Sequence, residues 1–253
     1  MLFETEQTRL RNIQSAMERG LPDMPAYPVH SGIWNVCAGG PSLRKEIKKI
    51  KKAKGEIVSV NGTHDYLLSK GIVPDVFIVT DPQEHCVRFV KAPRKAITYL
   101  VAAHCHPKVF DALQGYTVLV WYPLDYELPV PVSIGGGTTV GLRAINIGYT
   151  LGYRNIHLWG FDGCIKESHH AYPQPENDND ESKTVVYNGK SYQMTDWMCA
   201  QADNFEEMMR KHYLNITVHS KGVIKAISHI GVKQCQTKRR QATHTGFSTN
   251  MHN

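Results

Sequence analysis

From about residue 33 onwards, the chain alternates short apolar runs with longer amphipathic stretches. The apolar runs predict buried strands over 33–38, 56–60, 75–80, 96–102, 116–121, 155–159 and 215–219. The spacing of apolar residues between these runs predicts helices over 42–53, 63–70, 83–91, 107–113, 140–151 and 196–212. Strands that are apolar throughout and alternate with helices indicate an α/β fold, with a mostly parallel central sheet covered by helices on both faces.

The two ends of the chain and one internal stretch interrupt this alternation. Residues 3–20 predict an amphipathic helix, and a linker rich in proline and glycine follows it. Residues 163–194 are polar and predict a long flap over the edge of the sheet. We therefore expect an N-terminal helix and linker over 1–32, one α/β domain over 33–232 and an irregular basic tail over 233–253.

Composition excludes several classes of protein. No apolar run reaches the roughly 18 residues that span a bilayer, and the first twenty residues are too polar for a secretory signal, so we expect no membrane partner. The six cysteines lie far apart and form no CxxC pair, which favours a reducing, cytoplasmic compartment. The net charge of +6 is modest and accompanies no nucleic-acid-binding motif, so we expect no nucleic acid partner.

Small, polar and acidic residues follow several of the predicted strands. Because the carboxyl ends of parallel strands meet at one edge of a sheet, we expect these residues to form one binding site. They are Gly39, Gly40, Ser42, Asn61, Asp81, Gly160 and Asp162. The first three precede a helix whose free N–H groups would attract an anion, most naturally the phosphate of a nucleotide.

A second glycine-rich loop, 135–139, also precedes a helix. Gly136, Gly137, Thr138 and Thr139 offer backbone N–H groups and two hydroxyls, as a second anion-binding turn would. The loop lacks the lysine of a P-loop, and no Gly-x-Gly-x-x-Gly motif follows a strand. The two glycine loops are therefore expected to lie side by side and to hold the charge of one nucleotide.

Each of these residues also has a structural interpretation. Asn61 is a good helix cap, and Asp81 and Asp162 suit turns. His104 and His106 resemble part of a zinc site, but no second cluster of suitable spacing follows them. His169 and His170 in the flap are either solvated or act as general acid and base near neutral pH.

Several of these segments occur in a fixed order that resembles a known family. The segments are Gly40-Pro-Ser-Leu43, Val60-Asn-Gly62, Pro74–Pro82, Thr138-Thr-Val-Gly141 and Ile156–Asp162. Together they resemble the hydroxymethylpterin diphosphokinase-like family, which includes the motility-associated-factor (Maf) glycosyltransferases. They are also distantly similar to bacterial sialyltransferases that use CMP-sialic acid.

The resemblance covers about residues 33–220 and implies a Rossmann-like three-layer sandwich. It implies a nucleotide surrounded by Gly39, Gly40, Ser42, Asn61, Asp81, Thr139, Gly160 and Asp162.

The chain departs from these relatives at two places. The sialyltransferases carry a Tyr-x-Gly-His motif with the proposed general base, and the match here is Tyr187-Asn-Gly-Lys190. A lysine is protonated at neutral pH unless its pKa is strongly depressed, so His169 or His170 would take over. The pterin enzymes tend to have two aspartates that suit Mg²⁺ after the third strand, and here Asp81 is followed by Glu84.

These observations predict that the domain over 33–232 is a Rossmann-like nucleotide-binding transferase domain. The first hypothesis is a glycosyltransferase with a CMP-, UDP- or GDP-sugar donor, a sialic-acid-like sugar included, and catalytic residues His169, His170, Lys190 and Tyr187. The second is a diphosphokinase that moves pyrophosphate from ATP to a hydroxymethylpterin-like alcohol, with Asp81, Glu84 and Asp162 on Mg²⁺. The third is a nucleotide-binding module without activity. The sequence leaves the acceptor and the oligomeric state open.

Overall fold

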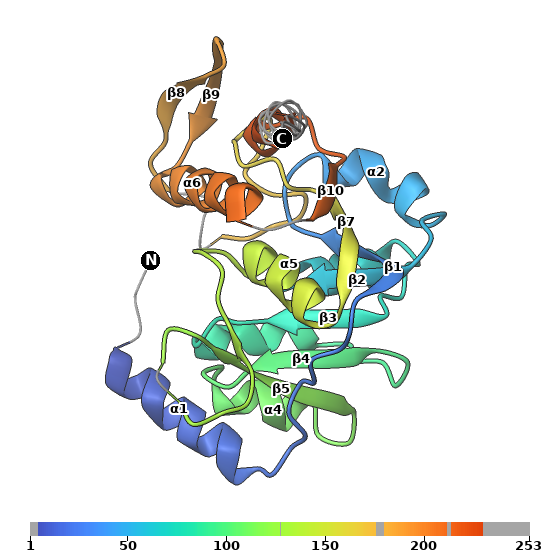
Figure 1. Cartoon of the computed structure of the whole chain (residues 1–253), viewed down its shortest axis with the longest axis vertical. Helices are drawn as coiled ribbons and strands as arrows, with labels where there is room; N and C mark the ends of the chain where they lie inside the picture. Colours follow the sequence, from blue (N-terminus) through green and yellow to red (C-terminus); the bar gives the residue numbers. More distant parts are fainter. Residues whose placement is uncertain (1–4, 127, 176–179, 212–213, 230–253) are drawn as a thin grey trace, which may run out of the picture.

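The computed structural model describes residues 5–126, 128–175, 180–211 and 214–229. Its centre is an eight-stranded sheet in the order β10-β7-β1-β2-β3-β4-β5-β6, in which every pairing is parallel (Figure 1). The strands are β1 (His30–Cys37), β2 (Glu56–Val60), β3 (Val76–Val79), β4 (Thr98–Ala102), β5 (Thr117–Pro123), β6 (Ser133–Ile134), β7 (Tyr153–Trp159) and β10 (Asn215–Val218). The predicted α/β fold with a mostly parallel sheet is confirmed.

Helices cover both faces of the sheet, as the alternation of side chains along β1 requires. Trp34 and Val36 point into the larger core against α5, while Cys37 points into a smaller core with Leu43 of α2. The helices are α1 (Glu6–Glu18), α2 (Leu43–Ile50), α3 (Thr63–Ser69), α4 (Pro107–Ala112), α5 (Val140–Thr150) and α6 (Asp196–Lys211), and η1 (Glu84–Val90) is a 3₁₀ helix. The result is the predicted three-layer sandwich.

Some elements differ from those that the sequence pattern predicted. The segment 83–91 forms a 3₁₀ helix rather than an α-helix, and β6 was not predicted. The polar flap contains an antiparallel hairpin of β8 (Lys183–Tyr187) and β9 (Lys190–Met194), which projects beside α6 (Figure 1). Residues 223–229 are helical, and the predicted tail 233–253 lies outside the described residues.

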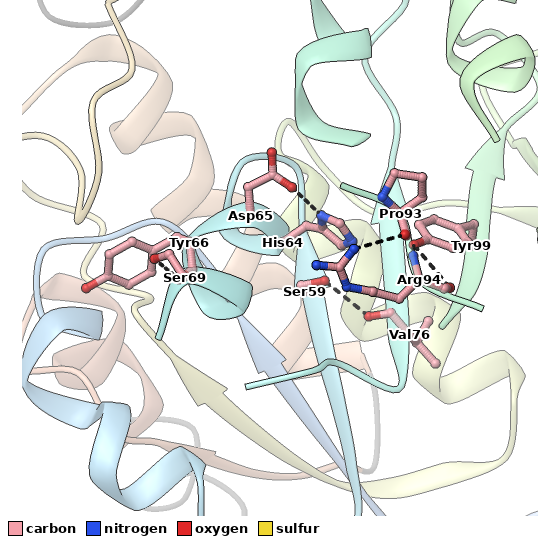
Figure 2. A network of polar contacts seen from close by, with 9 residues as sticks. All are labelled: Ser59, His64, Asp65, Tyr66, Ser69, Val76, Pro93, Arg94 and Tyr99. Carbon is pink, nitrogen blue, oxygen red and sulfur yellow. Dashed lines mark hydrogen bonds and ion pairs between the residues drawn. The ribbon is translucent and has the colours of Figure 1, made fainter. Parts of the chain in front are cut away.

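The buried His64 fastens α3 to the sheet. Its Nδ1 lies 2.6 Å from a carboxylate oxygen of Asp65, and its ring meets Phe77 edge-on at 4.9 Å between centroids. Figure 2 shows His64 next to Arg94 and Tyr99, where the Tyr99 hydroxyl accepts a hydrogen bond of 2.7 Å from the Arg94 N–H. The contacts of the His64 ring with Phe77 and Tyr99 thus hold α3 against β3 and β4.

The order of the strands creates one topological switch point. The chain builds β1 to β6 outwards in one direction, and then α5 carries it back to β7 on the other side of β1. Loops after β1 and β7 therefore leave the sheet toward opposite faces, which opens a crevice at their carboxyl ends. Within the described part of the chain, no helix has the length and apolar character needed to cross a membrane.

Candidate functional site

A cavity of about 200 Å³, here called the rim cavity, lies at the carboxyl ends of β1, β2, β3 and β7. Its walls also include the start of α5, one face of α6 and the segment 169–174. Ten of the residues singled out in the sequence line it: Gly39, Gly40, Asn61, Asp81, Thr138, Thr139, Gly160, Asp162, His169 and His170. The two glycine loops, which are about a hundred residues apart in the sequence, therefore face the same space.

The turn after β1 packs tightly against the turn after β7. The Gly40 N–H donates a hydrogen bond of 2.9 Å to the Gly160 carbonyl, and a Cβ at position 40 would lie 2.3 Å from that oxygen. Gly160 has a φ of +68°, and a Cβ there would lie 2.2 Å from the Ala38 carbonyl oxygen. Both glycines are required because backbone meets backbone at this point.

Asp162 occupies the end of α2 that the sequence predicted as a phosphate cradle. Its carboxylate is 1% exposed, accepts the Ser42 N–H at 2.9 Å and pairs with Lys166. Ser42 itself does not line the rim cavity. The carboxylate of the protein thus takes the N–H group that we expected a nucleotide phosphate to use, so Asp162 caps α2 and joins it to β7.

The start of α5 presents free backbone N–H groups to the rim cavity. Thr139 caps the helix through a hydrogen bond of 3.4 Å from the Leu142 N–H, and its hydroxyl also accepts 3.3 Å from Gln201 of α6. Val140 and Gly141 follow along the cavity wall, and neither N–H has an acceptor among the described residues. Two unpaired N–H groups at the positive end of an eleven-residue helix favour an anion here.

Gly136 and Gly137 do not line the rim cavity, contrary to the prediction. Their φ angles are +117° and +80°, and a Cβ at Gly136 would lie 1.8 Å from Nδ2 of Asn146. Both glycines instead line another cavity on the far side of the loop. They are needed for the shape of the loop that presents Thr138 and Thr139.

Asn61 and Asp81 form a polar pair on one wall. Asn61 has a left-handed backbone with φ of 45°, and its Nδ2 donates to the Asp81 carboxylate. Its Oδ1 is buried and has no partner among the described residues. Burial raises the pKa of Asp81, and the hydrogen bond from Asn61 acts in the opposite direction. An unused acceptor on a strained residue in a cavity is typical of a binding site.

The three predicted magnesium ligands do not form one group, although Asp81 and Asp162 both line the rim cavity. Asp81 follows β3 and Asp162 follows β7, and β1 and β2 lie between these strands. Glu84 lies outside the rim cavity on η1, where it pairs with Lys108. Among the described residues, no three His, Cys, Asp or Glu side chains are grouped as a metal site would need.

The segment 169–172 covers the rim cavity. The Ala171 N–H donates a hydrogen bond of 2.8 Å to the Gly39 carbonyl. The Arg44 side chain donates hydrogen bonds of 2.9 and 3.0 Å to the carbonyls of Ala171 and His170. Tyr172 lies under it with its hydroxyl 3.2 Å from Thr63 Oγ1, and burial raises its pKa to about 12. His169 lines the cavity with a buried Nε2 that has no partner among the described residues.

Tyr187 and Lys190 lie away from the rim cavity, so their predicted catalytic role is not supported by their position. They flank the Asn188-Gly189 turn of the β8–β9 hairpin, where both turn residues have positive φ. An Asn-Gly pair between alternating side chains is the strongest local signal for a two-residue hairpin, and it was overlooked. The Tyr-x-Gly-Lys match is therefore a turn.

We expect Lys190→Ala to leave the site intact. The side chain is exposed at the edge of the hairpin, so the free energy of unfolding should change by less than about 0.5 kcal/mol. Nucleotide affinity, measured by isothermal titration, should equal that of the unchanged chain. A clear loss of affinity would mean that the hairpin folds over the cavity when ligand binds.

His104 and His106 have structural positions rather than a shared metal site. His104 is buried, and its Nε2 contacts the Thr80 carbonyl, while its own carbonyl accepts 3.0 Å from Asn12 of α1. His106 caps α4 by accepting 3.2 Å from the Lys108 N–H. Both residues thus fasten helices to the end of β4.

Acid should destabilise the fold through His104. Burial lowers the pKa of His104 from 6.5 to about 4, so the unfolded chain binds this proton at a higher pH than the folded chain does. The contribution of neutral His104 to the free energy of unfolding is complete above pH 6.5 and is lost as the pH falls toward about 4. We expect a loss on the order of 1–3 kcal/mol across this window, measured by urea denaturation.

His219, whose pKa burial also lowers to about 4, contributes in the same window. The comparison therefore needs His104→Gln, which should show a shallower decline than the unchanged chain. Equal declines would assign the acid sensitivity elsewhere.

Part of the site was not predicted from the sequence. Trp197, Met198 and Gln201 of α6 line the rim cavity. The Trp197 indole N–H donates 2.8 Å to Asp180, which holds the flap against α6. No local signal identifies these residues, because α6 reaches the cavity only through tertiary packing.

Comparisons with known proteins agree with this architecture. The structure of the Maf glycosyltransferase from Magnetospirillum magneticum AMB-1 matches with a TM-score of 0.64 and 18% sequence identity. The match covers 93% of this chain and 43% of that protein, so this chain spans less than half of its length. At this identity the likeness shows a common fold. No curated protein matches the chain.

A family model described as 6-hydroxymethylpterin diphosphokinase MptE-like matches residues 10–168. The match covers more than half of the chain and contains the strands β1 to β7 together with both glycine loops. The chain belongs to the 6-hydroxymethylpterin diphosphokinase MptE-like family.

Proposed function

We propose that this protein is a nucleotide-dependent transferase and that it transfers a sugar from a nucleotide-activated donor. The observation that carries the proposal is the rim cavity. In it, two glycine loops, the unpaired N–H groups of α5 and a histidine with an unused nitrogen all face one space. Membership in a family named after a diphosphokinase supports transfer chemistry in general.

The charge around the rim cavity favours a donor with few phosphates. Asp81 and Asp162 are among the described residues that line it, and none of these lining residues is a lysine or an arginine. The start of α5 supplies about half of a positive charge, which suits one phosphate group. A triphosphate would meet the carboxylates of Asp81 and Asp162, of which Lys166 neutralises only that of Asp162. A donor such as a CMP-sugar, with a single phosphate, therefore fits best.

The cavity residues have separate roles in the proposed reaction. Asn61 Oδ1 and the Asp81 carboxylate would accept hydrogen bonds from the ribose or base, and α5 would hold the phosphate. His169 would remove the proton of the acceptor hydroxyl, whose oxygen then attacks the anomeric carbon of the donor. The bond from that carbon to the phosphate oxygen breaks, and the N–H groups of α5 stabilise the departing nucleotide.

A second candidate is diphosphate transfer from ATP to a pterin-like alcohol. The same lack of lysine and arginine around the cavity favours it, because Mg²⁺ would then accompany the triphosphate. The residues present fit this cation poorly. Asp162 is engaged by Ser42 and Lys166, and Glu84 lies outside the cavity, which leaves Asp81 as the carboxylate for it.

Isothermal titration with CMP, UDP, GDP and ATP tests both candidates. Each nucleotide is added once with Mg²⁺ and once with EDTA. For the sugar transferase we expect CMP to bind more tightly than ATP, with the same affinity under both conditions. Binding of ATP alone, and only with Mg²⁺, would favour the diphosphokinase, and binding of none of the four would overturn both.

The compartment belongs to the same proposal. The five cysteines in the described part, Cys37, Cys86, Cys105, Cys164 and Cys199, are free thiols. We propose that the protein is located in the reducing cytoplasm, where free thiols stay reduced. Nucleotide-activated donors would be present in the same compartment.

A further inference from the structure

A second cavity lies on the other side of the glycine-rich loop. It has a volume of about 450 Å³ and is bounded by Gly135–Gly137, the second half of α5 and the second half of α6. Gly137 lines this cavity and the next residue, Thr138, lines the rim cavity. One loop therefore separates two hollows, and nothing in the proposed transfer reaction uses the second one.

Two amide side chains in the second cavity have half of their hydrogen-bonding capacity unused. Asn146 Nδ2 donates 2.8 Å to the Gly135 carbonyl, and Asn204 Oδ1 accepts 3.1 Å from the Thr138 N–H. Within the described chain, Asn146 Oδ1 accepts no hydrogen bond and Asn204 Nδ2 donates none. The loop thus fixes both amides while leaving one acceptor and one donor at the cavity wall.

Apolar side chains form the rest of the wall. Leu124 is 62% exposed and Tyr149 is 36% exposed, which makes both of them exceptions among the large apolar residues of the described chain. Arg154 lies 3.8 Å from the centre of the Tyr149 ring and covers one of its faces, which holds the ring in place. Met208 of α6 adds a flexible apolar contact. Exposed apolar groups beside unused polar groups indicate a ligand site.

Among the described residues that line this cavity, the charges are balanced. Glu207 and Lys211 lie one turn apart on α6 and form an ion pair of 2.6 Å. The remaining polar groups are neutral and come from three elements: Ser133 from β6, Asn146 and Thr150 from α5, and Asn204 from α6. Hydrogen-bonding groups in several directions suit a ligand with hydroxyls around its ring, and a flat heterocycle would use only those in one plane.

We propose that the second cavity binds a neutral carbohydrate. An apolar face of the sugar ring would lie against Tyr149 and Leu124, and its hydroxyls would bond Asn146 Oδ1, Asn204 Nδ2 and Glu207. This site is independent of the nucleotide in the rim cavity, so either site can exist without the other.

Saturation-transfer NMR with millimolar lactose tests the carbohydrate site. The variants are Tyr149→Ala and Leu124→Ser, and Tyr27→Ala is the matched control because Tyr27 is 58% exposed and lines neither cavity. We expect lactose signals with the unchanged chain and with Tyr27→Ala. The affinity should fall about tenfold in both cavity variants, the equivalent of about 1.4 kcal/mol.

Thermal unfolding checks that each variant is folded. If Tyr149→Ala is unstable, Leu124→Ser still tests the site, because Leu124 is exposed and its replacement should leave the fold intact. No lactose signal from the unchanged chain, or equal affinity in a folded cavity variant, would overturn the proposal. So would a signal from 6-hydroxymethylpterin in place of lactose. CMP titration reports on the rim cavity separately, so failure here does not affect the proposed transferase.

Discussion

Alanine at position 40 is expected to lower the free energy of unfolding by about 3 kcal/mol and to abolish nucleotide binding. The added methyl group would lie 2.3 Å from the Gly160 carbonyl oxygen and 2.5 Å from Oδ2 of Asp162. The first is backbone and the second belongs to a carboxylate held by Ser42 and Lys166, so neither can move cheaply. The turns after β1 and β7 would move apart, and this movement would disrupt the floor of the rim cavity.

Gly135→Ala is the matched control for this substitution. Both glycines have φ in the ordinary range, but a Cβ at Gly135 would meet only Leu124 at 3.4 Å, an ordinary contact with a flexible side chain. Urea denaturation should therefore show a large loss of stability for Gly40→Ala and almost none for Gly135→Ala. A loss of stability in Gly40→Ala as small as that in Gly135→Ala would mean that the turn after β1 adapts more easily than its close packing indicates.

His169→Ala is expected to lower the rate of sugar transfer by about 10²–10⁴-fold while it leaves nucleotide affinity within a few-fold of its original value. Nε2 of His169 is buried in the rim cavity without a partner among the described residues, so it is available to take a proton from an acceptor. Isothermal titration first identifies the base of the preferred nucleotide. The rate is then measured as the release of that nucleotide from its sugar donor. Because that nitrogen has no partner to lose, stability should change little.

His169→Gln separates proton transfer from shape. Glutamine approximates the size and polarity of the imidazole but cannot exchange a proton near neutral pH, so it should be as slow as the alanine variant. Recovery of the rate in His169→Gln would assign the residue a positioning role. Unchanged turnover in both variants would exclude His169 as the base, and no turnover in the unchanged chain would favour a binding module without activity.

The apolar pattern was sufficient for most of the sheet. In Glu56–Val60, for example, the last three residues are buried between two layers of helices, so the short run marks a strand without any knowledge of its neighbours. Strand order could not be obtained in this way. The return of the chain to the far side of β1 decides that Asp81 and Asp162 follow strands that are separated by two others.

Two differences between the predicted site and the structure have a common cause. Asp162 and Ser42 are 120 residues apart, yet a hydrogen bond between them takes the N–H group that the sequence offered to a phosphate. The Tyr187-Asn-Gly-Lys190 segment resembled a catalytic loop, while its local conformation is that of a hairpin turn away from the cavity. In both cases the local motif is present in the chain as expected. Contacts with the surrounding structure determine what its residues do.

The sequence by itself determined the α/β class, most of the strands and helices, and the edge of the sheet that holds the site, because burial and backbone conformation act over neighbouring residues. Only the tertiary structure decided which glycine loop keeps free N–H groups, which histidine has an unused nitrogen in the cavity, and that α6 completes the wall. Those outcomes depend on contacts between segments about a hundred residues apart, and such contacts leave no periodic mark in the chain.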